Sequence, residues 1–389
     1  MKTTKFISLV IFFFTSFFSS VIYSQNGPIN QRYDIVMTPF WDFYSLNYQS
    51  VVNAGKGYTG IASSGDIMST ALNPASLQLD KKFQVYGEYT LKPNMPWLTS
   101  LGLNDLYLQQ NHPSMGFGFG YKVSKDFQFG AVYRSERNYR MHIGTVIVTN
   151  DSGETNGQTY EPYETFITHT FSVPAVYEYK FLKFGANLNL VILHSYRFLS
   201  TSGNGNAENN YYRFIPDFGL KLTPLKNLSF GITFTPGIKQ DITWKFDDAL
   251  QIDSTISYFP MKIGAGFEFR LLENKLFLSG EYRFEKTSDY QKVYLNDFNY
   301  KDRHNIHLGI EYKPDEKISV RTGFFTNFDI RDTTGGVSYL DPIGDYDQYY
   351  LTLGAGYKYQ NYNFNVAFLN AFSKRTSHMN FNFGVSYDF

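Results

Sequence analysis

The stretch that decides the fold class is TSHMNFNFGVSYDF, residues 376–389. Large apolar residues alternate with small or polar residues along most of its length. One face of the predicted strand carries the apolar set, which is Met379, Phe381, Phe383, Val385, Tyr387 and Phe389. The other face carries Asn380, Asn382, Gly384, Ser386 and Asp388. Because successive side chains of a strand point to opposite sides, this stretch predicts a strand with one face for lipid and one for water.

Similar segments recur upstream, and we expect about fourteen strands in all, although twelve or sixteen would also fit the pattern. The upstream segments are 82–91, 114–122, 126–139, 165–180, 182–199, 211–223, 226–236, 258–271, 275–284, 303–313, 316–328, 346–359 and 361–372. Membrane-spanning barrels have an even number of antiparallel strands, apolar outside and polar inside. The sequence therefore predicts an all-β protein, a closed transmembrane antiparallel β-barrel over residues 82–389.

The connections between these segments alternate in length. The short connections carry turn residues and are 123–126, 223–227, 272–274, 313–317 and 359–361. The long ones are polar and are 140–164, 200–210, 237–256, 285–302 and 329–345. A soluble β-sandwich has no reason to shorten every second connection, whereas an outer-membrane barrel has short periplasmic turns and long extracellular loops.

Composition points the same way. Aromatic residues make up 19% of the chain, with 38 Phe and 32 Tyr, which suits a lipid-facing belt with Tyr at the headgroup levels. Thirty-five basic residues balance 35 acidic ones, so nothing indicates a nucleic-acid partner. The chain has no Cys, which excludes disulfides, thiolate metal sites and a lipidated N-terminal Cys.

Both ends of the sequence carry features of export. Residues 1–24 combine Lys2 and Lys5 with a short apolar run and small residues before Gln25, which predicts a cleaved signal peptide. A membrane anchor is the alternative, but the run is shorter than a spanning helix needs. A strand closed by Phe389 resembles the signal recognised by the outer-membrane barrel assembly machinery. We therefore expect the Gram-negative outer membrane as the location, with its lipids and this machinery as partners.

Glycine recurs on one face of several predicted strands, as in Phe117-Gly-Phe-Gly120, Gly264-Ala-Gly266 and Gly354-Ala-Gly356. Two interpretations stay open at this point. The lumen is occupied by something other than side chains, such as a plug or a ligand, or the glycines allow strong strand curvature.

Residues 25–81, between the signal peptide and the first strand, are small and Gly-rich over 53–77 and predict a compact segment inside the lumen. A short helix is expected after Ser64-Gly-Asp66, ending at Asn73-Pro74. This segment resembles the hatch of the FadL-type outer-membrane transporters of long-chain fatty acids and aromatic hydrocarbons. The residues that carry the resemblance, in family order, are Gly57, Gly60, Ala62, Asp66, Asn73, Pro74 and Ala75. Ser76 stands where that family usually has Gly.

The C-terminal third is also similar to the last hairpins of that family, over 307–323, Asp341-Pro and 347–357. The resemblance implies passive uptake of a hydrophobic small molecule through a pocket between the hatch, residues 25–81, and the barrel wall. It implies gating by the hatch motif and capture of the ligand by an apolar loop. The candidate capture residues are Met95, Trp97, Leu98, Leu101 and Leu103. That loop could equally lie against lipid headgroups.

Nothing in the sequence predicts an enzyme, a cofactor or a metal. Neither a G-x-S-x-G nor an H-E-x-x-H motif occurs. His304 and His307 are three residues apart, which places them on opposite faces of a strand. Two other functions stay open, a FadL-like barrel that serves as a protein-secretion shuttle or assembly factor, and a general porin. No motif in the sequence identifies the ligand.

Overall fold

The computed structural model describes residues 50–96, 107–142, 146–149, 155–198, 207–246, 252–292, 299–332, 347–372 and 378–389. The predicted signal peptide, residues 1–24, therefore lies outside the described residues and stays a prediction. The same holds for 25–49.

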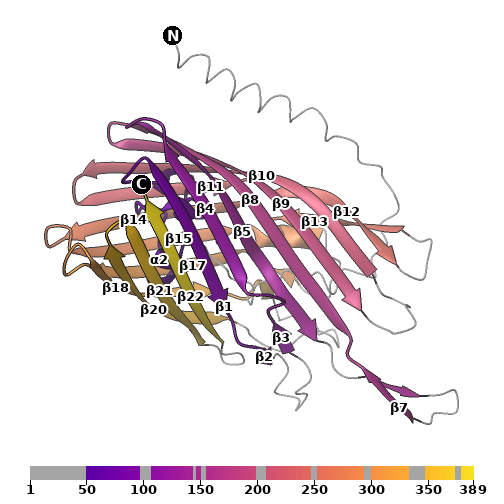
Figure 1. The fold of residues 1–389 in the computed structure, drawn as a ribbon. Coiled ribbons are helices and arrows are strands. Elements are labelled where there is room, and N and C mark those ends of the chain that lie inside the picture. The colour runs from indigo at the N-terminus through magenta and orange to yellow at the C-terminus, as the bar shows by residue number, and fades with distance from the viewer. Residues whose placement is uncertain are drawn as a thin grey trace.

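Fourteen antiparallel strands form one closed barrel. They are β1 (Phe83–Leu91), β4 (Ser114–Lys122), β5 (Phe127–His142), β8 (Tyr163–Tyr179), β9 (Leu182–Phe198), β10 (Ala207–Leu225), β11 (Leu228–Thr235), β14 (Lys262–Leu271), β15 (Leu276–Glu285), β17 (Arg303–Tyr312), β18 (Ile318–Asn327), β20 (Gln348–Tyr359), β21 (Tyr362–Phe372) and β22 (Met379–Asp388). β1 pairs with β22, from Gln84 opposite Asp388 to Leu91 opposite Phe381, and this pairing closes the barrel. Figure 1 shows the first strand, in indigo, beside the last, in yellow.

All fourteen predicted strands are present, so the predicted count and the barrel are confirmed. Two of the predicted loops contain β-hairpins instead. The loop 237–256 contains most of a hairpin, β12 (Ile238–Phe246) with β13 (Ile252–Phe259), which extends the wall because β12 also pairs with β10. The loop 140–164 contains the hairpin β6 (Val146–Thr149) with β7 (Thr155–Tyr160). The sequence of β12 does alternate, since Ile242, Trp244 and Phe246 are interleaved with Asp241, Thr243 and Lys245, whereas β6 and β7 show no such alternation.

The remaining short elements lie in the connections between barrel strands. They are β2 (Met95–Pro96), β3 (Tyr107–Gln109), the 3₁₀ helix η6 (Thr287–Lys292), β16 (Asn299–Tyr300) and β19 (Arg331–Asp332). None of the helices in the described ranges has the length and hydropathy needed to cross a bilayer.

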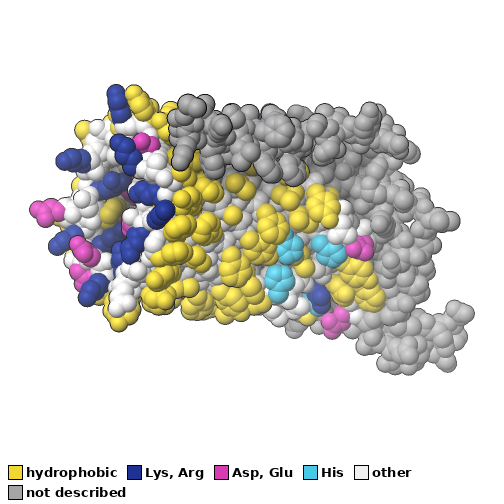
Figure 2. Space-filling model, turned by 45° about the horizontal axis from the view of Figure 1, so that its top comes forward, with side chains coloured by type: hydrophobic (Ala, Val, Ile, Leu, Met, Phe, Trp, Pro, Cys, Tyr) yellow, Lys and Arg dark blue, Asp and Glu magenta, His cyan; other side chains and the backbone are white. Residues whose placement is uncertain are grey.

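The outward face of the wall is apolar and the inward face is polar. On β22, Phe381, Phe383 and Val385 are exposed while Asn380 and Asn382 are buried toward the lumen, as the alternation predicts. On the face that Figure 2 shows, apolar side chains form a band across the wall, and most of the charged side chains gather at one end of it. Strands pair all their backbone groups only when the sheet closes, which is what a chain in hydrocarbon requires.

The described part of the N-terminal segment, which we call the inner segment (residues 50–81), packs against the inner face of the wall. It contains the helix α2 (Val51–Gly55) and two 3₁₀ helices, η3 (Ile67–Ala71) and η4 (Pro74–Ser76). η3 lies within the short helix that the sequence predicts after Asp66. α2 contacts β18, β20, β21 and β22, whereas η4 contacts β8, β9 and β10, so the segment reaches opposite sides of the barrel.

The inward glycines explain how the inner segment fits. A β-carbon at Gly118 would lie 2.5 Å from Ile67 Cγ2, and one at Gly354 would lie 2.8 Å from Gly55 Cα. Gly264 likewise faces Ile61. The structure therefore supports the first interpretation of the glycine pattern at these positions, because glycine removes side chains where the inner segment approaches the wall. Gly266 and Gly356 instead face side chains of the wall itself.

Candidate functional site: the contact between the inner segment and the wall

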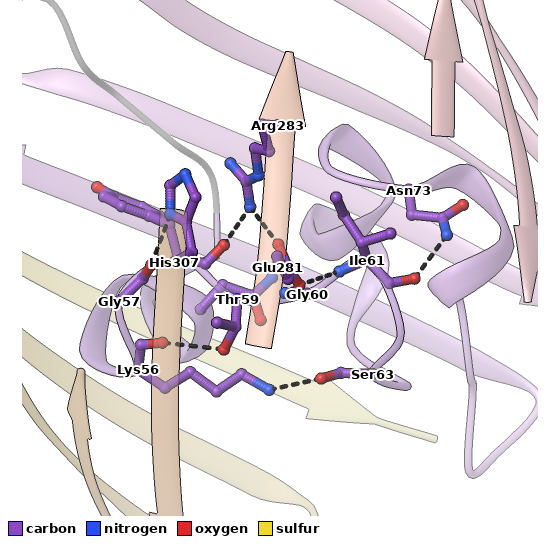
Figure 3. Close-up of polar contacts among 12 residues, drawn as sticks. Lys56, Gly57, Thr59, Gly60, Ile61, Ser63, Asn73, Glu281, Arg283 and His307 are labelled. Carbon is purple, nitrogen blue, oxygen red and sulfur yellow. Dashed lines mark hydrogen bonds and ion pairs between the residues drawn. The ribbon is translucent and has the colours of Figure 1, made fainter. Parts of the chain in front are cut away.

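The turn from Gly57 to Ile61 lies on a row of inward side chains that crosses neighbouring strands (Figure 3). In this row Glu281 of β15 stands opposite His307 of β17, which stands opposite Phe325 of β18. These wall residues are more than 200 positions away in sequence from the turn that they contact. Tertiary folding alone brings them together.

Glu281 is the main polar contact of this turn. One of its carboxylate oxygens accepts hydrogen bonds from the backbone amides of Gly60 and Ile61, the latter at 2.6 Å. Its other oxygen pairs with Arg283 at 2.7 Å, and Arg283 also donates to the carbonyl of Tyr58. Buried hydrogen bonds to a charged group contribute about 1.5–3 kcal/mol each, so this cluster stabilises the contact between the turn and the wall.

Gly57 is held from two further strands. His307 Nδ1 lies 2.8 Å from its carbonyl oxygen, and its amide donates to Thr352 Oγ1 at 2.9 Å. The same Thr352 hydroxyl donates to the carbonyl of Gly55 at 3.0 Å. Gly57 has a φ of +69°, and a β-carbon there would lie 2.4 Å from the carbonyl oxygen of Leu308. Only glycine satisfies both requirements.

Two lysines, one in the inner segment and one in the wall, donate hydrogen bonds to serine hydroxyls of the inner segment. Lys56 Nζ donates to Ser63 Oγ at 3.0 Å, and Ser63 Oγ donates to Glu268 of β14 at 2.5 Å. Lys221 of β10 donates to Ser64 Oγ at 2.5 Å. We call residues 55–64, which bond the wall through these polar groups, the polar arc.

Asn73 fixes the turn that contains the family-like Asn-Pro-Ala. Its side-chain oxygen caps η4 by accepting from the amide of Ala75 at 2.9 Å, and its amide nitrogen donates to the carbonyl of Ile61 at 2.6 Å. Pro74 and Ala75 pack on Gly185 of β9, where a β-carbon would lie 2.2 Å from the Ala75 nitrogen. Asn73 thus joins this turn to the polar arc.

Asp66 caps η3 and meets a second carboxylate through a serine. Its side chain accepts from the amide of Ser69 at 3.0 Å and from Ser50 Oγ at 3.0 Å. The amide of Ser50 donates to Glu88 of β1 at 3.1 Å. Burial raises the pKa of Asp66 above its usual range, although these hydrogen bonds favour the ionised form.

The opposite part of the inner segment meets the wall with apolar side chains. Ile67 and Met68 fill the space above Gly116, Gly118 and Gly130 of β4 and β5. We call Ile67, Met68, Leu77 and Leu79 the apolar arc, and these four residues form one buried cluster with wall side chains.

The six residues predicted as the hatch motif all lie in the inner segment but make their contacts at different places in the barrel; they are Gly57, Gly60, Asp66, Asn73, Pro74 and Ala75. The structure shows nothing about their role in gating. Met95 lies in β2, but its side chain lies outside the described residues, as do Trp97, Leu98, Leu101 and Leu103 altogether. The capture role of these five residues stays a prediction.

The sequence analysis missed the wall partners Glu281, His307 and Thr352. Each is an inward position of an alternating strand, where polar residues are ordinary, so only their approach to the inner segment distinguishes them. Phe389 exchanges backbone hydrogen bonds with Phe83 and stacks on its ring at 5.1 Å. Its role as an assembly signal stays a prediction. Among the described residues, no group of three or more side chains is arranged to hold a metal ion.

Fold and site together define an outer-membrane-type β-barrel whose lumen contains a compact N-terminal segment. Among solved structures, the chain is similar to the CymD monoaromatic hydrocarbon channel, at 14% identity and a TM-score of 0.61, covering 88% of this chain and 99% of that one. It is similar to a Pseudomonas aeruginosa FadL homologue, at 13% identity and a TM-score of 0.66, covering 88% and 99%.

It is also similar to the Pseudomonas putida toluene transporter TodX, at 14% identity and a TM-score of 0.59, covering 87% and 97%. At such identities the likeness establishes the fold, and the chain has the FadL-type barrel fold that the sequence resemblance predicts. No protein-family model matches the sequence, and no curated protein sequence is significantly similar to it.

Proposed function

We propose that the protein transports hydrophobic small molecules passively across the Gram-negative outer membrane, with the inner segment as a hatch. The observation that carries this proposal is the contact between the inner segment and the wall. That contact consists of a limited set of hydrogen bonds at the polar arc and of side-chain packing at the apolar arc. The barrel itself closes through strand pairing alone, so the inner segment can move while the barrel stays intact.

The physics suits an apolar substrate. An apolar solute gains about 25 cal/mol for each Å² that leaves water, so no energy source is needed if each compartment on the route is greasier than the one before. The solved structures with the same fold are described as hydrocarbon channels, a FadL homologue and a toluene transporter, which supports the same class of substrate.

An irregularity in the strand pairing of the wall gives a candidate exit. β4 pairs with β5 only as far as Gly116 opposite Arg134, and the register between β5 and β8 shifts between Ser135 and Asn138. Such a bulge disrupts the ladder locally. We propose that a ligand released from the hatch leaves sideways near this bulge.

The test is uptake of a radiolabelled arene into proteoliposomes that contain the full-length protein or a variant lacking residues 53–77. We expect both to assemble as barrels, which heat-modifiable migration on gels would verify, and the deletion to change the uptake rate. Unchanged uptake in an assembled deletion variant would remove the hatch from the proposal. Uptake no faster than in empty liposomes for the wild type would refute transport itself.

A general porin would conduct small ions steadily in planar bilayers, whereas a barrel occupied by the inner segment should conduct little until that segment is deleted. A secretion shuttle should copurify with exported protein and should not change arene uptake.

A further inference from the structure

Three aromatic rings face the lumen side by side on β17, β18 and β20. His307, Phe325 and Tyr350 occupy consecutive cross-strand pairs. The rings of His307 and Phe325 are 5.3 Å apart and 5° from parallel, and those of Phe325 and Tyr350 are 4.2 Å apart and 8° from parallel. We call these three residues the aromatic row. The inner wall of such a barrel is usually polar, so a stacked row of rings there calls for a function.

One ring nitrogen of His307, at the edge of this row, is a buried hydrogen-bond acceptor. His307 Nδ1 faces the carbonyl oxygen of Gly57, which can only accept, so in the neutral imidazole Nδ1 carries the proton and Nε2 keeps a lone pair. No described residue donates a hydrogen bond to Nε2, and the side chain is 1% exposed. In Figure 3 this second nitrogen points away from Gly57. A buried acceptor of this kind favours a partner that brings a donor.

The ring of Tyr58 lies where a ligand ring would reach the row. It meets the Phe325 ring edge-on, with centroids 5.3 Å apart at 73°. The Tyr58 backbone is held independently of the ring, because its amide donates to the Asn53 carbonyl and its carbonyl accepts from Arg283. Displacement of the ring from Phe325 would therefore leave these two backbone hydrogen bonds in place. Tyr58 has a φ of +56°, an unfavourable backbone conformation for a tyrosine that is often found at functional sites.

We propose that the aromatic row binds the ring of a phenol, which replaces the Tyr58 ring and donates its hydroxyl hydrogen to His307 Nε2. This inference rests on the proposed function and names its substrate class. The ligand is a neutral phenol, because a phenolate has no hydrogen to donate to Nε2. A plain arene fills the same place but leaves Nε2 without a donor.

The experiment measures two probes that differ by one hydroxyl, 4-propylphenol and propylbenzene, by equilibrium dialysis against the full-length protein in detergent. Protein-free micelles give the reference ratio for partition into detergent. We expect the wild type to prefer the phenol by about tenfold beyond that reference, which corresponds to about 1.4 kcal/mol. His307→Phe keeps a ring for Phe325 to stack on and removes the acceptor, so the preference should fall to the micelle ratio.

His307→Phe also removes the bond to Gly57, so Thr352→Val is the matched control. It removes two hydrogen bonds to the same turn and keeps the acceptor. It should change the binding of both probes by the same factor and keep their ratio. Tyr58→Ala should bind both probes more tightly, because no ring has to leave Phe325.

A phenol preference that survives His307→Phe, or a wild type with no preference, would overturn the proposal, and the second result would mean that water alone satisfies Nε2. In either case binding of propylbenzene would leave the proposed function standing. Failure of both probes to bind the wild type beyond micelle partition would count against the proposed function as well.

Discussion

The polar arc and the apolar arc attach the same inner segment to opposite sides of one barrel by different physics. The polar arc uses a few directional hydrogen bonds to wall groups such as Glu281, His307 and Thr352. The apolar arc uses the shape of Ile67 and Met68 over strand glycines. The directional bonds of a group are lost together when that group is removed, whereas apolar packing is divided among many weak contacts. We therefore expect the polar arc to control opening and the apolar arc to act as the pivot.

Glu281→Ala should have the largest effect. It removes the acceptor of two backbone amides and leaves Arg283 without its carboxylate, and breaking a buried pair costs about 3–5 kcal/mol. We expect the exchange protection of the Gly60 and Ile61 amides to collapse while the Ile67 amide stays protected by Gln84. Hydrogen exchange on the refolded barrel measures both. Glu281→Gln keeps an acceptor and should lose much less of this exchange protection. If Glu281→Ala lowers protection equally at Ile61 and Ile67, the two arcs are not attached independently.

Gly323→Val should have the next largest effect. A β-carbon at position 323 would lie 2.2 Å from the Gly57 nitrogen, which is backbone and cannot rotate aside. Overpacking of this kind costs about 1–3 kcal/mol, and single-channel conductance should rise as the polar arc is displaced. The control is Gly118→Val on the other side, where the nearest atom is a side-chain methyl carbon, Ile67 Cγ2, and not backbone. A larger conductance in that control would reverse our assignment of the pivot.

Asn73→Ala tests the connection between the arcs. It removes a helix cap, worth about 1 kcal/mol, and the bond to the Ile61 carbonyl. We expect altered arene uptake with normal barrel assembly. Ser76→Ala is the matched control, since the Ser76 hydroxyl is buried without a partner among the described residues and its loss should be neutral. If Asn73→Ala assembles and transports like the wild type, the Asn-Pro-Ala turn has no part in gating.

Asp66→Asn should have the smallest effect and appear only as a change in pH dependence. Because burial raises the pKa of Asp66, the ionised form is less favourable inside the barrel than in water. Attachment should therefore be strongest below the usual carboxyl range and weaken as the pH rises through the raised pKa. Glu88, Tyr86 and Ser50 surround this carboxyl, so Glu88→Gln is the companion variant. Exchange of the Ser69 amide across a pH titration should flatten in Asp66→Asn, and an unchanged slope would remove Asp66 as the titrating group.

Much of the fold could be predicted because membrane strands show their environment locally. The alternation around Phe381 and Phe383 needs no partner to be recognised, and the short turns mark one end of the barrel. The hairpin β12–β13 was missed although β12 alternates in sequence, because the many charged and polar residues of 237–256 fit a polar loop equally well. Within the site, Asp66 and Asn73 could be found because capping acts over two or three residues.

Glu281 and His307 could not be found that way. An inward polar residue on a strand is equally consistent with ordinary lumen wall, and nothing local shows that a backbone amide from 220 positions earlier will meet it. The glycine pattern had two interpretations for the same reason, since a missing side chain does not say what fills the space.

The amino-acid sequence by itself determined that the chain forms a closed sheet with an apolar exterior, because the period of two is a property of each strand. Only the tertiary structure decided how residues 50–81 pack against the wall, which charges hold them and which rings face the lumen. Those contacts depend on barrel closure, which sets the strands at distances and registers that are not encoded within any one segment.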